Sequence, residues 1–105
     1  MIIQKNAIST LQEAMENLNK QDIAELSMEG QLQLLVAQRA VYLELQAQQA
    51  SQMQSATTEF VMITTGLKDS ENGFRDIQKW AKTAEKTGKF VNGLLKGISL
   101  ILTLL

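Results

Sequence analysis

The 105-residue sequence contains no cysteine, no histidine and no proline. Without the first two residue types, the chain has no disulfide, no thiolate or imidazole ligand for zinc or haem, and no Cys or His nucleophile. Aromatic residues make up 5% of the chain, hydrophobic residues 45% and charged residues 20%, a balance typical of an ordered chain. The length suits one small domain. These absences exclude most enzyme classes, and we expect a non-enzymatic protein.

Two other kinds of site lack the residues that they need. Glu13 with Glu16, and the pair at 25 and 29, lie three and four residues apart on helix faces, but without histidine we interpret them as solvated surface charge. Gly88 and Lys89 do not have the spacing of a phosphate-binding loop. The sequence therefore predicts no catalytic residue, no bound metal and no cofactor.

The formal net charge of −1 conceals a division of charge along the chain. Residues 1–74 hold four basic and nine acidic side chains, whereas residues 75–105 hold six basic and two acidic ones. We divide the single structural unit into an acidic, Gln/Ala-rich helical segment, 1–73, and a basic amphipathic helix with an apolar terminus, 74–105. This asymmetry predicts that the basic end faces an anionic surface or the acidic part of a neighbouring copy.

Helix-forming residues fill most of the chain, and no run of alternating apolar and polar residues is long enough for a strand. The sequence therefore predicts an all-α fold. Apolar residues at steps of three and four from Ile3 to Leu18 predict a first helix of about four turns. Asp22 and Glu25 have the spacing of a capping box, which predicts that a second helix begins near Ile23.

This second helix is predicted to extend to about residue 65, with a break allowed at Gly30. Leucines in its first half give way to small residues, and eight glutamines lie between 31 and 54. Amides and small residues allow helices to approach closely and bond laterally, as in a repeating assembly. A solvated helix with a Gln-rich outer face in an ordinary bundle explains the same composition equally well.

Most of the turn-forming residues lie between Thr64 and Gly73. A hinge at 66–73 makes the long segments on either side antiparallel. The expected architecture is then a helical hairpin or a short three-helix arrangement with long helices. A continuous rod, with the hinge extended, is the competing geometry.

The C-terminal segment has the most regular apolar pattern. Apolar residues repeat every seven positions from Ile77 to Leu105, and a second series from Trp80 to Ile101 lies midway between them. This pattern predicts one continuous amphipathic helix whose end, 97–105, is apolar almost all round. Because two short partner helices cannot cover such a terminus, we expect it to contact a membrane or a neighbouring subunit. The predicted interface consists of Trp80, Val91, Leu94, Leu95, Ile98, Ile101, Leu102 and Leu105.

Two further sets of residues belong to this prediction. Gly93 and Gly97 have the small-xxx-small spacing that permits close helix packing, here within a homo-oligomer. Residues 90–105 extend about 24 Å, less than the roughly 30 Å of a hydrocarbon layer, so partial insertion fits better than a span. A stripe of lysines beside the seam is expected to contact an anionic surface, and it consists of Lys79, Lys82, Lys86, Lys89 and Lys96.

The sequence thus favours a self-associating structural protein that engages a membrane or neighbouring subunits through its C-terminal helix, such as a virion, secretion-conduit or pore subunit. The expected partners are further copies of the chain, an anionic membrane and a protein. Nucleic acid is disfavoured because the lysine stripe lies beside aliphatic rather than aromatic residues. With no cleavable signal peptide evident, we expect a place at a membrane or within a large assembly.

Two alternatives stay open at this point. In the first, the chain is a soluble helical adaptor or scaffold module, and the same apolar face binds a protein partner. In the second, the C-terminal helix is simply the core of its own domain, buried against the rest of the chain. Burial of those side chains within a single copy would remove the main argument for an external contact.

Overall fold

The computed structural model describes residues 7–54 and 63–105 of the chain. These residues form five α-helices and one short 3-10 helix without any strand, so the predicted all-α class is confirmed. The molecule is elongated, with extents of 48 × 24 × 19 Å. The elements in chain order are α1 (Ala7–Lys20), η2 (Ile23–Glu25), α2 (Met28–Gln54), α3 (Thr65–Asp69), α4 (Glu71–Lys86) and α5 (Asn92–Leu102).

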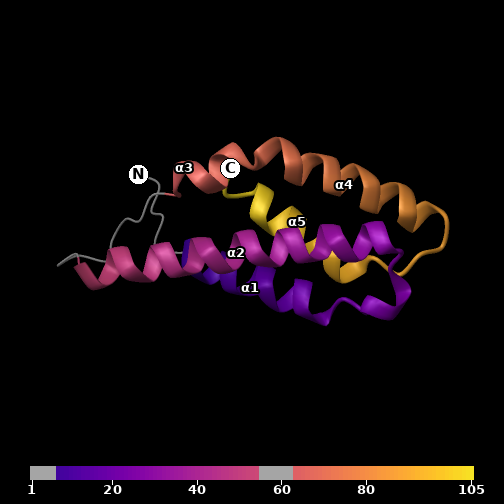
Figure 1. Cartoon of the computed structure of the whole chain (residues 1–105), viewed down its shortest axis with the longest axis horizontal. Coiled ribbons are helices and arrows are strands. Elements are labelled where there is room, and N and C mark those ends of the chain that lie inside the picture. The colour runs from indigo at the N-terminus through magenta and orange to yellow at the C-terminus, as the bar shows by residue number, and fades with distance from the viewer. Residues whose placement is uncertain (1–6, 55–62) are drawn as a thin grey trace.

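The helices pack side by side along the long axis (Figure 1). α1 and α2 form an antiparallel hairpin joined through η2, and α4 runs along the opposite side of the molecule (Figure 1). α5 returns between them and packs against α1 on one side and α4 on the other. The turn after α4, at residues 87–91, therefore places the most apolar helix at the centre.

The start of the second helix differs from the prediction. Asp22 does cap a helix, since its carboxylate accepts a hydrogen bond from the Ala24 N–H at 3.0 Å, but that helix is the single turn of η2. The chain then becomes extended at Leu26, whose side chain is buried, and α2 begins at Met28. A helix therefore does begin at Ile23, but it is short, and the long helix begins only at Met28 because the extended backbone at Leu26 interrupts the helical path.

Gly30 does not break α2. It lies where α2 passes the indole of Trp80 on α4, and a Cβ at this position would be 2.7 Å from the Trp80 Cη2 atom. Ser27 precedes the helix and its hydroxyl accepts a hydrogen bond from the Gly30 N–H at 3.2 Å. The glycine therefore allows close contact between two helices rather than ending one.

The hinge predicted at 66–73 is helical in the structure, and this prediction is wrong. Thr64 caps α3, because its hydroxyl accepts a hydrogen bond from the Leu67 N–H at 3.3 Å. Ser70 separates α3 from α4 with φ −88° and ψ 0°, which bends the helical path without reversing it. α2 and α4 run in opposite directions (Figure 1), and residues 55–62, between α2 and α3, lie outside the described residues. A good N-cap and two buried residues on one side, Leu67 and Phe74, outweigh the turn propensity here.

The continuous C-terminal helix predicted from the heptad pattern is also wrong. Gly88 has φ 86°, and the N–H groups of Gly88 and Lys89 donate to the carbonyl oxygens of Glu85 and Ala84 at 3.0 and 3.1 Å. These two bonds form a Schellman motif, which ends α4. The chain then turns, and α5 runs antiparallel to α4 (Figure 1). The seam of the sequence is therefore two facing surfaces of a helical hairpin.

The core is built around α5. Leu94, Ile98 and Ile101 have no exposed surface, and apolar side chains from the other helices surround them. Burying each such side chain contributes about 1.5–3 kcal/mol relative to leaving it in water. The surrounding buried residues are Leu11, Ala14 and Leu18 on α1, Leu34, Ala37 and Val41 on α2, and Phe74, Ile77 and Ala81 on α4.

Candidate functional site

The interface predicted from the sequence lies mostly inside the molecule. Val91, Leu94, Ile98 and Ile101 are buried in the single copy, and the other four members pack against the core while partly exposed. The expectation that these side chains face outward is therefore corrected. The reason is that α5 is short enough for α1 and α4 to cover its two sides. One long C-terminal helix would have left its apolar end without neighbouring helices. The four partly exposed members are Trp80, Leu95, Leu102 and Leu105.

The two glycines predicted to permit close helix packing lie where α5 meets α1. A Cβ at Gly93 would be 2.6 Å from the Asn17 carbonyl oxygen, and one at Gly97 would be 2.6 Å from Leu18 Cδ2. The close approach thus occurs within one chain, not between copies. Gln21 fastens the same junction, as its side-chain amide donates to the Phe90 carbonyl oxygen at 2.6 Å and accepts from the Leu94 N–H at 2.8 Å.

The five predicted lysines are all exposed, but they do not form one stripe. Lys79, Lys82 and Lys86 follow one side of α4, and Lys89 continues from its end. Lys96 lies on α5 beside α1, where it lines a shallow depression with Lys20. Within the described parts of the chain, no helix combines the length and apolar character needed to cross a bilayer.

A different apolar surface is exposed instead, on the side of α2 that faces away from the core. Met28 is 87% exposed, Leu32 and Leu35 are each 62% exposed, and three further large apolar side chains lie about half exposed on the same side. We call these six residues the α2 outer face. Its members are Met28, Leu32, Leu35, Val36, Tyr42 and Leu43.

The opposite side of α2 carries a second apolar set. Leu34, Ala37 and Val41 are buried against the rest of the molecule, and they follow each other at helical spacing half a turn away from the outer face. α2 is consequently apolar on two opposite sides. One side is explained by the core, while the other has no cover from the described residues of the chain.

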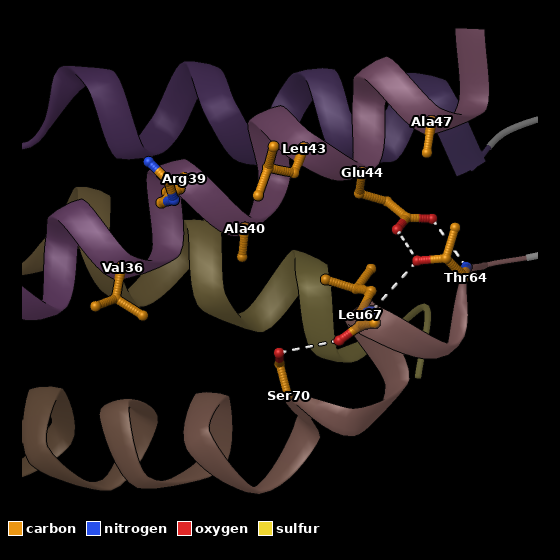
Figure 2. A pocket seen from close by; sticks show the side chains of 10 residues that line it. Val36, Arg39, Ala40, Leu43, Glu44, Ala47, Thr64, Leu67 and Ser70 are labelled. Carbon is orange, nitrogen blue, oxygen red and sulfur yellow. Dashed lines mark hydrogen bonds between the residues drawn. The ribbon is translucent and has the colours of Figure 1, made fainter. Parts of the chain in front are cut away.

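A groove runs beside the α2 outer face. It has a volume of about 340 Å³ and lies between α2 and α3, with Val36 and Leu43 on one wall and Leu67 and Ser70 on the other (Figure 2). Small residues of α2, Ala40 among them, line it between these walls. The groove therefore adds a concave apolar surface next to the convex α2 outer face.

Glu44 holds one end of this groove together. Its side chain is 3% exposed and points toward Thr64 (Figure 2). The carboxylate accepts hydrogen bonds from the Thr64 N–H at 3.1 Å, from the Thr64 hydroxyl, and from the Gln48 side-chain amide at 2.7 Å. These bonds compensate for the desolvation of a buried acid and attach α3 to α2. We interpret Glu44 as a structural residue that fixes the groove wall.

Two charged side chains lie on the exposed side of α2, and they have opposite sign. Glu29 is in its first turn and Arg39 is ten residues later, within the row of the outer face. Both are exposed, and neither has an ion-pair partner among residues 7–54 and 63–105. The surface is therefore apolar with one negative and one positive point along its length.

The α2 outer face and its groove present mainly apolar and small side chains. No group of three or more acidic side chains in the described parts of the chain could hold a metal ion. The groove is lined by aliphatic, small and hydroxyl residues, by the exposed Arg39 and by the buried Glu44, whose carboxylate already accepts hydrogen bonds from Thr64 and Gln48. This surface therefore offers exposed apolar side chains for contact.

The sequence pattern of α2 does not single out its outer face, and the C-terminal segment has a longer and more regular apolar pattern. A signal was present, since Met28, Leu32, Leu35 and Tyr42 follow steps of four, three and seven. The overlapping series Leu34, Ala37 and Val41 obscured it, because two apolar series half a turn apart look like an unpatterned apolar helix.

Comparisons with known proteins add no relative to this description. Scans of protein-family models, of curated proteins and of solved structures each find no match to the chain.

Proposed function

We propose that this protein is a non-enzymatic structural subunit that self-associates through the α2 outer face. One observation carries the proposal, namely that six large apolar side chains lie exposed on one side of a 27-residue helix. A contiguous apolar surface of this kind on a small domain is typical of a protein contact site.

The size of the surface supports a stable contact. The exposed parts of the six side chains amount to on the order of 700 Å², close to the roughly 800 Å² per partner of a standard protein interface. Leucine, methionine and tyrosine dominate it, and methionine and tyrosine are enriched in interfaces. Contact between the outer faces of two copies would remove part of this apolar area from water.

The proposal keeps the self-association expected from the sequence but moves its location from α5 to α2. Partial insertion of α5 into a membrane loses its support, because the side chains that would insert are buried in the fold. A place within a larger assembly, such as a virion or a secretion conduit, agrees with an exposed helical contact face. Binding of a different protein by the same face, as in an adaptor, is the alternative.

The test is the molar mass of the full chain in solution, measured by size-exclusion chromatography with light scattering over a hundredfold range of concentration. We expect the mass to rise with concentration. Leu35→Glu should keep the chain monomeric, because pairing the outer faces would bury the new carboxylate without a partner. Gln12→Glu adds the same charge to an exposed position of α1 and should leave association unchanged.

Circular dichroism on the same samples should show equal helicity for the wild type and both variants. A wild-type chain that is monomeric at every concentration would reject the proposal, and the adaptor alternative would then be preferred. Equal association of wild type and Leu35→Glu would also reject it, since self-association would then use another surface.

A second candidate function is contact with an anionic surface through α4. It rests on the exposure of Lys79, Lys82, Lys86 and Lys89 along α4 and the turn after it, on the opposite side of the molecule from the α1–α2 hairpin (Figure 1). Each lysine near an anionic membrane contributes about 1 kcal/mol. Such a contact leaves the α2 outer face free and is therefore compatible with self-association.

A further inference from the structure

We infer that α2 pairs antiparallel with α2 of a second copy, and that Arg39 of each copy lies beside Glu29 of the other. The inference rests on the proposed self-association and specifies its geometry. It is carried by the spacing of the exposed residues and by the signs and positions of two charges.

The exposed row of α2 has the spacing of a helix–helix seam. Met28, Leu32, Leu35, Arg39 and Tyr42 follow steps of four, three, four and three, an average of 3.5 residues. All five are exposed in the single copy. Side chains at this period meet a partner helix continuously along its length. The partner that this row fits best is therefore another helix with the same period, which α2 itself provides.

Arg39 decides the orientation. It occupies a seam position, so a parallel pair in register would bring the two Arg39 guanidinium groups together in the middle of an apolar contact. Like charges that face each other in a desolvated contact are strongly unfavourable. A polar or charged residue in a seam is known to select orientation and register for this reason. The parallel arrangement is consequently disfavoured.

An antiparallel pair solves the same problem. When Leu32 of one copy lies level with Leu35 of the other, the twofold axis falls between residues 33 and 34. Arg39 is then level with Met28 of the second copy, one residue from Glu29. The exposed ends of both side chains can reach each other, and symmetry provides two such Arg–Glu pairs. Pairs of this kind add modest affinity but strong preference for one orientation.

This arrangement is closed, because the twofold axis uses the same face of both copies. The two leucine layers lie at its centre, and the two ion pairs lie about one and a half turns away on either side, near the edges where water reaches them. The dimer therefore has an apolar centre and a charged rim, the usual layout of a protein interface.

Charge reversal tests the pairing. In the full chain, Arg39→Glu and Glu29→Lys should each raise the dimer dissociation constant about tenfold, since each variant places two like-charged pairs in the dimer. The double variant should return to within about threefold of the wild type, because the pairs are restored with exchanged signs. Lys79→Glu, the same reversal on α4, should have no effect. If Arg39→Glu leaves the dissociation constant unchanged or lowers it, Arg39 does not lie beside Glu29 of the second copy and the inference fails.

A distance measurement tests the orientation independently of charge. The chain has no cysteine, so Gln49→Cys gives one site for a nitroxide label near the end of α2. In the antiparallel dimer the two labels should be about 45 Å apart, whereas a parallel dimer would hold them within about 20 Å. A short distance in a sample that is dimeric by light scattering overturns the orientation and leaves self-association standing. A sample with no dimer overturns both.

Discussion

α5 and α2 are treated differently by the fold, although both are rich in apolar residues. α5 is apolar on most sides and lies in the middle of the molecule, with α1 and α4 covering it. α2 contains more polar residues, yet it leaves six large apolar side chains in water. The comparison shows that apolar content does not decide which helix is exposed. The number of neighbouring helices decides it, and α2 has neighbours on one side.

The largest effect should come from placing a charge on each helix in turn. Leu94→Asp introduces an unpaired carboxylate at a fully buried position of α5, and we expect it to cost more than about 4 kcal/mol and abolish the cooperative unfolding transition. Leu35→Asp, at an exposed position of α2, should change the unfolding free energy of the monomer by less than about 0.5 kcal/mol. Thermal unfolding followed by circular dichroism separates the two, and equal melting curves would break the comparison.

The contact of α5 with α1 should be the next most sensitive. Gly93→Ala places a methyl group 2.6 Å from the Asn17 carbonyl oxygen, and because backbone cannot move aside easily we expect a loss of about 1–3 kcal/mol. Gly73→Ala on α4 is the matched control, since no atom lies within 4 Å of its added methyl group. That substitution should stabilise the protein by up to about 1 kcal/mol. Denaturant titrations measure the unfolding free energy of both variants. Destabilisation by Gly73→Ala would contradict the expectation that only the glycine in a close helix contact resists substitution.

A smaller loss should follow from removing the side-chain bonds that hold the start of α5. Gln21→Met keeps the size of the buried side chain but removes the bonds to the Phe90 carbonyl oxygen and the Leu94 N–H. The buried Leu94 N–H and the partly buried Phe90 carbonyl oxygen then lose their partner, and we expect a cost of about 1–2 kcal/mol. Amide hydrogen exchange should increase at Leu94 more than at residues of α2. Unchanged protection of the Leu94 amide would show that the Gln21 side chain does not stabilise the start of α5.

The smallest effect on stability should come from the lysines of α4. Reversing Lys79, Lys82 and Lys86 to glutamate should change the unfolding free energy by about 0.5 kcal/mol or less, because these side chains are exposed. The same triple variant should lose recovery with anionic vesicles in flotation, and salt should weaken wild-type recovery. Recovery that is equal for wild type and variant would remove the second candidate function.

Much of the fold could be predicted from local pattern, but the direction of the chain could not. The all-α class follows from composition, and Asp22 acts as a helix cap as its spacing to Glu25 indicates. The heptad pattern after Ile77 predicts one helix, because hydrophobic spacing does not show where the chain reverses its direction. The dipeptide Thr87-Gly88 was the local signal, since glycine accepts the positive φ that ends α4.

The candidate site was harder to predict because exposure depends on what the rest of the chain covers. Leu94 and Leu35 are both leucines at seam positions of apolar helices, and nothing local distinguishes them. They differ in exposure because α1 and α4 pack onto α5 and cover Leu94, whereas no helix in the described part of the chain covers Leu35. The roles of Gln21 and Glu44 could not be predicted either, because their hydrogen-bond partners, such as Phe90 and Thr64, are far away in the sequence.

The contact between Gly30 and Trp80 gives the protein a built-in optical reporter. The chain has a single tryptophan, and its indole lies against the backbone of α2 near the start of that helix. Any movement of α2 away from α4 would let water reach the ring and shift its emission to longer wavelength. The intrinsic fluorescence of the unmodified protein therefore reports the separation of these two helices, during unfolding or when a second copy binds, without any added dye.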